Sequence, residues 1–333
     1  MKVFAALRLC GEYFLLLLMA GCTHKPSGPL AFVTNERDGT ITVIDTNTDR
    51  VYSTITVGGR LRGIRLSHDK KKIWVAISYP SNQSQGEDKI AELDVNGKII
   101  AKYEAGTDPE NFAIDDNATH LYIANEDAGA ISVLNTADGK VEHQIPVAEE
   151  PEGVAFTPNG KSVYATCETA GDIFVINTAQ YKTTAHFVVG GRPRNVVFSP
   201  DGSRAYIPSE STGIVHIIDT LNQQQVQAIQ LPTNSRPMCL VMSKDGKQLY
   251  LSTGWGASIC VVDIPSLKIL NNIKVGPRPW GFAMSPDGKQ LFVANGPSND
   301  ISVVDLTTGA ETARIKAGQS PWGVAIVPVP SSP

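Results

Sequence analysis

The feature that most constrains this chain is a short phrase of the general form Gly-x-x-Pro-x-Gly, which recurs at a nearly fixed interval. Successive copies are 48, 42, 42, 44, 42 and 42 residues apart. A period of about 40 residues indicates a repeat architecture, in which each unit buries its apolar face against its neighbours. We call the fourth position of the phrase the mark. The seven marks are Leu61, Pro109, Pro151, Pro193, Pro237, Pro279 and Pro321.

Each repeat contains four short runs with the residue types of β-strands, separated by turn residues such as Ser-Pro-Asp-Gly. Four strands in a repeat of this length are typical of propeller blades. After residue 30 no segment sustains an apolar period of 3.6 residues, so helices should be nearly absent. In the repeat that begins at Pro279 the runs span residues 280–284, 291–294, 301–305 and 311–315.

The two ends of the chain predict that the ring of blades is closed. Three strands precede the first mark, and one strand, residues 322–327, follows the last. Together they complete a seventh four-stranded blade, which removes an open sheet edge. We therefore predict an all-β fold, a single seven-bladed β-propeller over residues 30–328, with a tail of residues 329–333. A β-sandwich or an open solenoid would explain neither the spacing nor these ends.

The first 22 residues have the composition of an export signal. A basic start precedes an apolar run that is too short to span a bilayer. Residues 18–22 (Leu-Met-Ala-Gly-Cys) resemble a bacterial lipoprotein box, although Met19 stands where that pattern prefers leucine. The resemblance implies a signal peptide over residues 1–21, lipidation of Cys22 and a tether over residues 22–29. Ordinary signal cleavage near the same point is the alternative.

The export prediction sets the compartment and the charge. Thr23, rather than aspartate, follows Cys22, which by the sorting pattern of enteric lipoproteins implies delivery to the outer membrane. We expect a monomer in the bacterial periplasm, anchored through that cysteine. Without residues 1–21 the chain carries 27 basic and 32 acidic side chains, a net charge of −5. This charge gives no general attraction for nucleic acid.

The alternation of strand directions places the marks around one mouth of the central channel, together with the loops after each second strand. Residues beside the marks suggest an acidic sector at marks 109 and 151, a basic one at 193 and 237, and an aromatic one at 279 and 321. We expect the mouth to bind a small polar ligand or a protein partner. The candidate residues are Arg62, Glu110, Glu126, Glu152, Glu168, Arg194, Glu210, Arg236, Trp280 and Trp322.

A second interpretation of these charges is purely structural. Arginines and glutamates of neighbouring blades could pair across the face, as exposed ion pairs that contribute about 0–1 kcal/mol each. The tryptophans could then simply pack between blades.

No motif for catalysis or cofactor binding is present. The chain lacks Cys-x-x-Cys-His, Gly-x-Ser-x-Gly and a phosphate-binding loop, and its six histidines are scattered over different repeat positions. We therefore expect no cofactor, no metal and no catalytic residue. Glutamates at the mouth could hold Ca²⁺ or act as general bases, but nothing in the sequence shows that two of them converge.

The repeats resemble a known family. Leu-Tyr-Ile-Ala-Asn at 121–125, Ile-Ser-Val at 131–133 and the Pro-Glu-Gly mark at 151–153 resemble the YVTN-type β-propeller repeat over residues 30–328. Asn-Glu-Asp at 125–127 and Pro-Trp-Gly-Val at 321–324 are similar to the seven-repeat group associated with pyrroloquinoline-quinone-dependent alcohol catabolism. This likeness implies a non-catalytic accessory protein, whose partner would be a quinoprotein dehydrogenase or a transporter component.

Two further functions stay open at this point. A related seven-bladed family hydrolyses sugar lactones, so a lactonase is the enzymatic alternative. A related periplasmic propeller binds nucleic acid, although the net charge of −5 disfavours that reading here.

Overall fold

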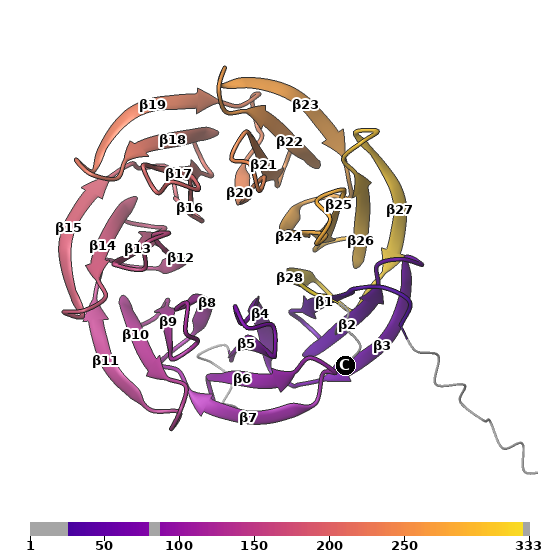
Figure 1. The fold of residues 1–333 in the computed structure, drawn as a ribbon, viewed down its shortest axis with the longest axis horizontal. Coiled ribbons are helices and arrows are strands. Elements are labelled where there is room, and N and C mark those ends of the chain that lie inside the picture. Colours follow the sequence, from indigo (N-terminus) through magenta and orange to yellow (C-terminus); the bar gives the residue numbers. More distant parts are fainter. Residues whose placement is uncertain (1–25, 80–86, 329–333) are drawn as a thin grey trace, which may run out of the picture.

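A computed structural model describes residues 26–79 and 87–328 of the 333-residue chain. Seven four-stranded antiparallel sheets stand radially around a central axis, as Figure 1 shows. The predicted seven-bladed β-propeller is therefore confirmed, and the described residues contain no helix. The predicted signal peptide (1–21), Cys22 and the tail (329–333) lie outside the described residues.

The blades are numbered here from the one that contains both chain ends, and strands are given from the axis outward. Blade 1 comprises β28 (Pro321–Val327), β1 (Leu30–Asn35), β2 (Thr40–Asp45) and β3 (Arg50–Thr56). Blade 2 comprises β4 (Arg60–Leu66), β5 (Lys72–Ser78), β6 (Lys89–Asp94) and β7 (Ile99–Glu104). Blade 3 comprises β8 (Pro109–Ile114), β9 (His120–Asn125), β10 (Ala130–Asn135) and β11 (Val141–Pro146).

The remaining four blades follow the same order. Blade 4 comprises β12 (Pro151–Phe156), β13 (Ser162–Cys167), β14 (Asp172–Asn177) and β15 (Lys182–Val188). Blade 5 comprises β16 (Val197–Phe198), β17 (Arg204–Ser209), β18 (Ile214–Asp219) and β19 (Gln224–Gln230). Blade 6 comprises β20 (Pro237–Met242), β21 (Gln248–Thr253), β22 (Ser258–Asp263) and β23 (Lys268–Lys274). Blade 7 comprises β24 (Pro279–Met284), β25 (Gln290–Asn295), β26 (Asp300–Asp305) and β27 (Ala310–Lys316).

Blade 1 closes the ring in the predicted way. Its inner strand β28 pairs antiparallel with β1, from Leu30 opposite Val327 to Val33 opposite Val324. The three N-terminal strands and the single C-terminal strand thus form one sheet, and no sheet edge is left open at the junction.

The apolar core lies between neighbouring blades. The second and third strands of each blade are almost wholly buried, whereas outer strands such as β3 are largely exposed. Tyr122 of blade 3, for example, meets Phe156 of blade 4 edge to face, with ring centroids 5.1 Å apart. This packing fixes the blades relative to one another and makes the channel wall a rigid scaffold.

A recurrent irregularity positions the residues that follow the marks. In six blades the inner strand shifts register directly after the mark. A hydroxyl from the second strand satisfies the freed backbone: Thr34 Oγ1 accepts from the Gly323 amide (2.9 Å) and donates to the Arg62 carbonyl of the next blade (2.8 Å). Ser252 makes the same link between Cys239 and Trp280. Bulges of this kind re-aim side chains, here toward the mouth.

The predicted tether is partly docked. Ser27 donates through its backbone amide (2.6 Å) and its hydroxyl (3.0 Å) to Asp45, and Asn47 donates to the Ser27 carbonyl. Asp45 ends β2 at the face opposite the marks, since β2 begins beside them at Thr40. Within the described ranges, the chain forms no helix that is long and apolar enough to cross a membrane.

Candidate ligand site at the channel mouth

The turn before each mark has an unusual backbone. In all six proline-marked blades the residue before the proline is left-handed, with φ between 45° and 60°. This conformation is uncommon outside glycine and carries strain, which tends to concentrate at functional sites. In blade 2, where leucine replaces proline, Gly58 and Gly59 take the positive φ values instead. The six left-handed residues are Asp108, Glu150, Arg192, Arg236, Arg278 and Ser320.

A first group of charges, which we call the blade 2–3 cluster, comprises Arg60, Arg62, Glu36, Asp108, Glu110 and Glu126. Arg62 contacts Glu110 at 2.7 Å and Glu36 at 3.3 Å. Arg60 lies 3.3 Å from both Asp108 and Glu110. Among the described residues Glu126 has no guanidinium partner within ion-pair distance.

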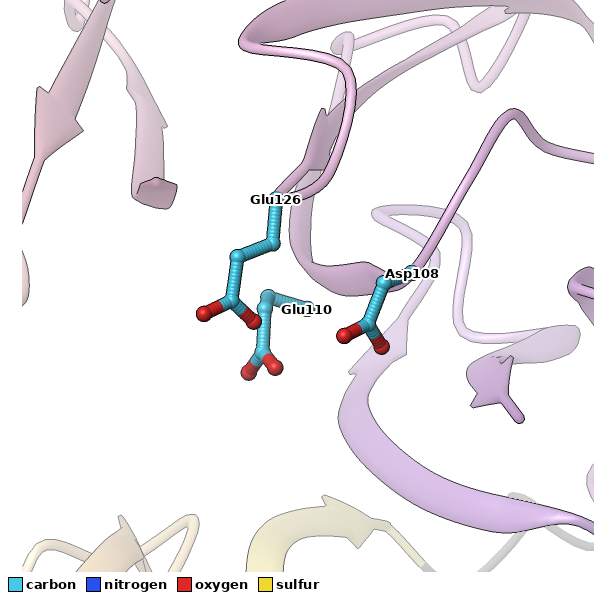
Figure 2. Close-up of side chains that lie close together, drawn as sticks. All are labelled: Asp108, Glu110 and Glu126. Carbon is cyan, nitrogen blue, oxygen red and sulfur yellow. The ribbon is translucent and has the colours of Figure 1, made fainter. Parts of the chain in front are cut away.

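Three carboxylates of this cluster converge, as Figure 2 shows for Asp108, Glu110 and Glu126. Their oxygens lie within 4.8 Å of one another. Glu110 is almost fully buried, and burial raises its pKa well above the ordinary range, aided by Glu152 and hydrogen-bonded Glu126 and opposed by Arg62. Burial thus favours the protonated form of Glu110. Glu110 and Asp108 are already engaged by the guanidiniums of Arg60 and Arg62, and we propose no metal here.

A second group, the blade 4–5 cluster, comprises Arg192, Arg194, Glu152, Glu168 and Glu210. Arg194 contacts all three carboxylates, Glu210 at 2.6 Å, while Arg192 contacts Glu168 and lies 3.6 Å from Glu210. The Arg194 side chain is only 11% exposed. Burial alone would lower its pKa, but Glu152 and Glu210 outweigh that effect and raise it.

Two tryptophans connect the clusters. The rings of Trp280 and Trp322 stack at a centroid distance of 6.0 Å and an interplanar angle of 26°. The Arg62 guanidinium lies 5.8 Å from the Trp322 ring, and that of Arg194 lies 5.8 Å from the Trp280 ring. These cation–π contacts connect Trp322 to the blade 2–3 cluster and Trp280 to the blade 4–5 cluster.

The ring surrounds an open cavity of about 200 Å³. Below it, the channel narrows to a constriction of about 40 Å³, and a wider cavity of about 410 Å³ lies beyond, toward the opposite face. Glu152, Arg194 and Trp280 line both the mouth cavity and the constriction. The mouth cavity is lined by Glu36, Arg62, Glu110, Glu126, Glu150, Glu152, Glu168, Arg192, Arg194 and Trp280.

The structure brings the predicted site residues together at one mouth. Seven of the ten line its cavity directly, and Trp322 lines the constriction. Glu210 and Arg236 lie outside the lining, but ion pairs connect Glu210 to Arg194 and Arg236 to Glu210. Whether these residues bind a ligand stays a prediction.

Two sequence expectations about the mouth are corrected. The acidic and basic sectors are not separate, because long arginine side chains reach carboxylates of the preceding or following blade, as Arg194 reaches Glu152. Nor are most of these ion pairs exposed: Glu110, Glu152, Glu168 and Glu210 are all buried. The expected pairing across blades is present, but in an environment where unpaired charges are costly.

Sequence reasoning missed the channel interior. Arg65, Asn111 and Asn195 line the constriction together with Cys239. A signal for Arg65 was present in the repeat alignment, because the equivalent position of the other six blades holds only alanine or valine.

The chain matches the YNCE-like beta-propeller family over residues 25–285. It belongs to this family. The comparison with curated proteins finds no match.

Solved structures show the same propeller. A periplasmic gluconolactonase of Pseudomonas aeruginosa, PpgL, is 20% identical with a TM-score of 0.76, covering 91% of this chain and 100% of that one. A functionally unknown protein from Desulfotomaculum acetoxidans is 19% identical (TM-score 0.76; 89% and 98% covered). Hydrazine synthase of Kuenenia stuttgartiensis is 18% identical (0.71; 82% and 96%). At such identities the likeness of this YNCE-like propeller to them concerns fold alone.

Proposed function

We propose that this protein is an exported, lipid-anchored, monomeric binding protein that holds a small polyhydroxylated molecule in its mouth cavity without catalysis. The observation that supports this most is the cavity of about 200 Å³ ringed by carboxylates and guanidiniums beside a tryptophan face. Carboxylates accept hydrogen bonds from hydroxyl groups, guanidiniums donate to them, and a tryptophan face packs on the C–H face of a sugar-like ring.

The charges at the mouth are held in place before any ligand arrives. Arg194 is shared by three carboxylates, and the backbone of Arg62 is bonded to the second strand of the preceding blade. Little ordering is then needed on binding, which favours affinity for a small ligand. Each cluster has more carboxylates than guanidiniums, which disfavours phosphate-rich nucleic acid. Neither the family match nor the similar structures support a link to quinone-dependent alcohol catabolism, so the proposal omits it.

Calorimetric titration with sodium gluconate and with glucose tests the proposal. Glu168→Gln and Trp280→Ala should each weaken the binding about tenfold, since each removes one polar or one stacking contact. Glu311→Gln, in an exposed ion pair on β27, is the matched control and should bind normally. No saturable binding of any polyol or sugar acid would reject the proposal.

Export and anchoring are tested separately. Cys22→Ser should release the protein from the membrane fraction and abolish labelling by fatty acid, with the mouth unaffected. Unchanged membrane association of the variant would contradict lipidation at this residue.

A lactonase is the second candidate, and the raised pKa of Glu110 favours it. A protonated carboxyl beside an ionised one is the pairing required to donate a proton to a leaving alkoxide while a neighbour activates water. PpgL, described as a periplasmic gluconolactonase, shares the fold. Turnover of glucono-1,5-lactone above the spontaneous rate, lost in Glu110→Gln, would establish hydrolysis and overturn the non-catalytic proposal.

A further inference from the structure

Arg65 departs from the pattern of its ring. It lies on β4, four residues after the mark of blade 2, at a level of the channel where the other blades present small apolar side chains. Packing alone does not require a guanidinium at a position where alanine or valine suffices elsewhere. The equivalent residues are Ala113, Ala155, Val197, Val241, Ala283 and Ala325.

The charge of Arg65 is not balanced by the protein. Among residues 26–79 and 87–328, no carboxylate lies within ion-pair distance of it, and the one hydrogen bond it donates goes to the Ile64 carbonyl (3.1 Å). At the mouth, by contrast, Arg62 and Arg194 each contact two or more carboxylates. Burial also lowers the pKa of Arg65. Arg65 is half-buried at the cavity wall, so its guanidinium is reachable from the cavity, and an anion there would supply the partner that the protein does not.

Beside Arg65 lies the wider cavity of about 410 Å³. Its outer rim includes His68 and Thr157, which follow the ends of β4 and β12 at the face opposite the marks. Its inner end is marked by Arg65, Asn195, Cys239 and Phe282, since all four also line the constriction. The walls between carry apolar side chains, which include Val154, Phe156, Val197, Leu240 and Val241.

The volume of this cavity falls within the range of small-molecule pockets, about 300–1,000 Å³, and its lining combines apolar side chains with polar groups at the rim (His68, Asp116 and Thr157) and at the inner end. The constriction beyond Arg65 has a volume of about 40 Å³, which is enough for one or a few waters and too small for an apolar ligand body. A ligand entering from the opposite face would therefore stop with its leading group at the guanidinium.

We propose that this cavity is a second binding site, which takes a free amphipathic monocarboxylic acid from solution. The carboxylate meets the Arg65 guanidinium, whose planar fork suits it, and the apolar body lies against the valine, leucine and phenylalanine walls. The site shares no residue with the mouth cavity, so it goes beyond the proposed function.

Calorimetric titration with sodium octanoate tests this, with 1-octanol as the uncharged probe of equal length. Octanoate should saturate one site. Arg65→Met should weaken octanoate binding tenfold or more, Arg65→Lys should weaken it less, and neither should change the weaker binding of octanol. Equal octanoate affinity in the wild type and Arg65→Met would overturn the proposal.

A second variant separates binding from folding. Ala155→Trp narrows the cavity from β12 while Arg65 stays in place, and it should abolish octanoate binding with the circular dichroism spectrum unchanged. If octanoate still binds to this variant, the cavity is not the octanoate site. If sodium nitrate binds as tightly as octanoate in the same titration, the site takes an inorganic anion only. The proposed contact between an apolar ligand body and the cavity walls would then be wrong. Gluconate titration in the presence of octanoate reports on the mouth independently.

Discussion

The blade 2–3 and blade 4–5 clusters have the same arrangement of residues but differ in how their carboxylates are paired with guanidiniums. Each has two arginines that flank a mark, facing carboxylates from neighbouring blades. In the blade 4–5 cluster every carboxylate touches a guanidinium. In the blade 2–3 cluster no guanidinium among the described residues reaches Glu126, and the pKa of the neighbouring Glu110 is raised by burial. The same arrangement of residues thus gives one cluster in which every carboxylate contacts a guanidinium and one in which the pKa of a buried carboxyl is raised.

The largest expected effect comes from removing the centre of the fully paired cluster. Arg194→Met leaves Glu152, Glu168 and Glu210 with far less compensation in a buried setting, and should lower the free energy of unfolding by about 3–5 kcal/mol. Urea denaturation followed by tryptophan fluorescence measures it. Arg314→Met, in an exposed pair with Glu311, is the control and should lose less than about 1 kcal/mol. Equal losses in the two variants would contradict a special role for the cluster.

A smaller loss is expected for Arg62→Met, because Glu110 can respond by keeping its proton. The destabilisation should be smaller at acidic pH, where Glu110 more readily keeps its proton, and should grow as the pH rises toward and through its raised pKa. Denaturation of both variants over a series of pH values checks this. A loss in Arg62→Met that does not depend on pH would show that the two clusters are equivalent after all.

Glu110→Gln should flatten the pH dependence of stability. The folded-state pKa of Glu110 lies above its unfolded value, so its proton stabilises the fold at low pH, and that contribution is lost as the pH rises through the folded pKa. One proton gives a slope of at most about 1.4 kcal/mol per pH unit. Profiles of unfolding free energy against pH should therefore diverge between wild type and variant as the pH rises, and parallel profiles would refute the raised pKa of Glu110.

The smallest effect is expected at the edge of the blade 4–5 cluster. Arg236 lies 4.5 Å from the ring of Trp255, which is 64% exposed. Trp255→Ala removes one exposed cation–π contact and should reduce stability by about 0.5–1 kcal/mol, without any pH dependence. If Trp255→Ala lowers the free energy of unfolding as much as Arg194→Met does in the same assay, blade 6 would have to be counted as part of the blade 4–5 cluster.

The period of the marks was sufficient to predict the fold, because each repeat forms one blade and the number of marks gives the number of blades in the ring. It also placed Arg62, Glu110, Arg194 and Trp280 at one mouth, since equivalent repeat positions become neighbours around the axis. It could not predict which arginine pairs with which carboxylate, because the reach of a long arginine side chain depends on its conformation. The raised pKa of Glu110 could not be predicted for the same reason, because its burial and the approach of Glu126 are properties of the assembled ring.

The docking of Ser27 onto Asp45 has a consequence for how the molecule would stand on a surface. Asp45 lies at the face opposite the marks, and only four residues separate Cys22 from Ser27. Five peptide steps span at most about 18 Å. An anchor at Cys22 would thus orient the propeller with its charged mouth away from the bilayer and accessible to diffusing molecules. The Arg65 cavity would then open toward the bilayer.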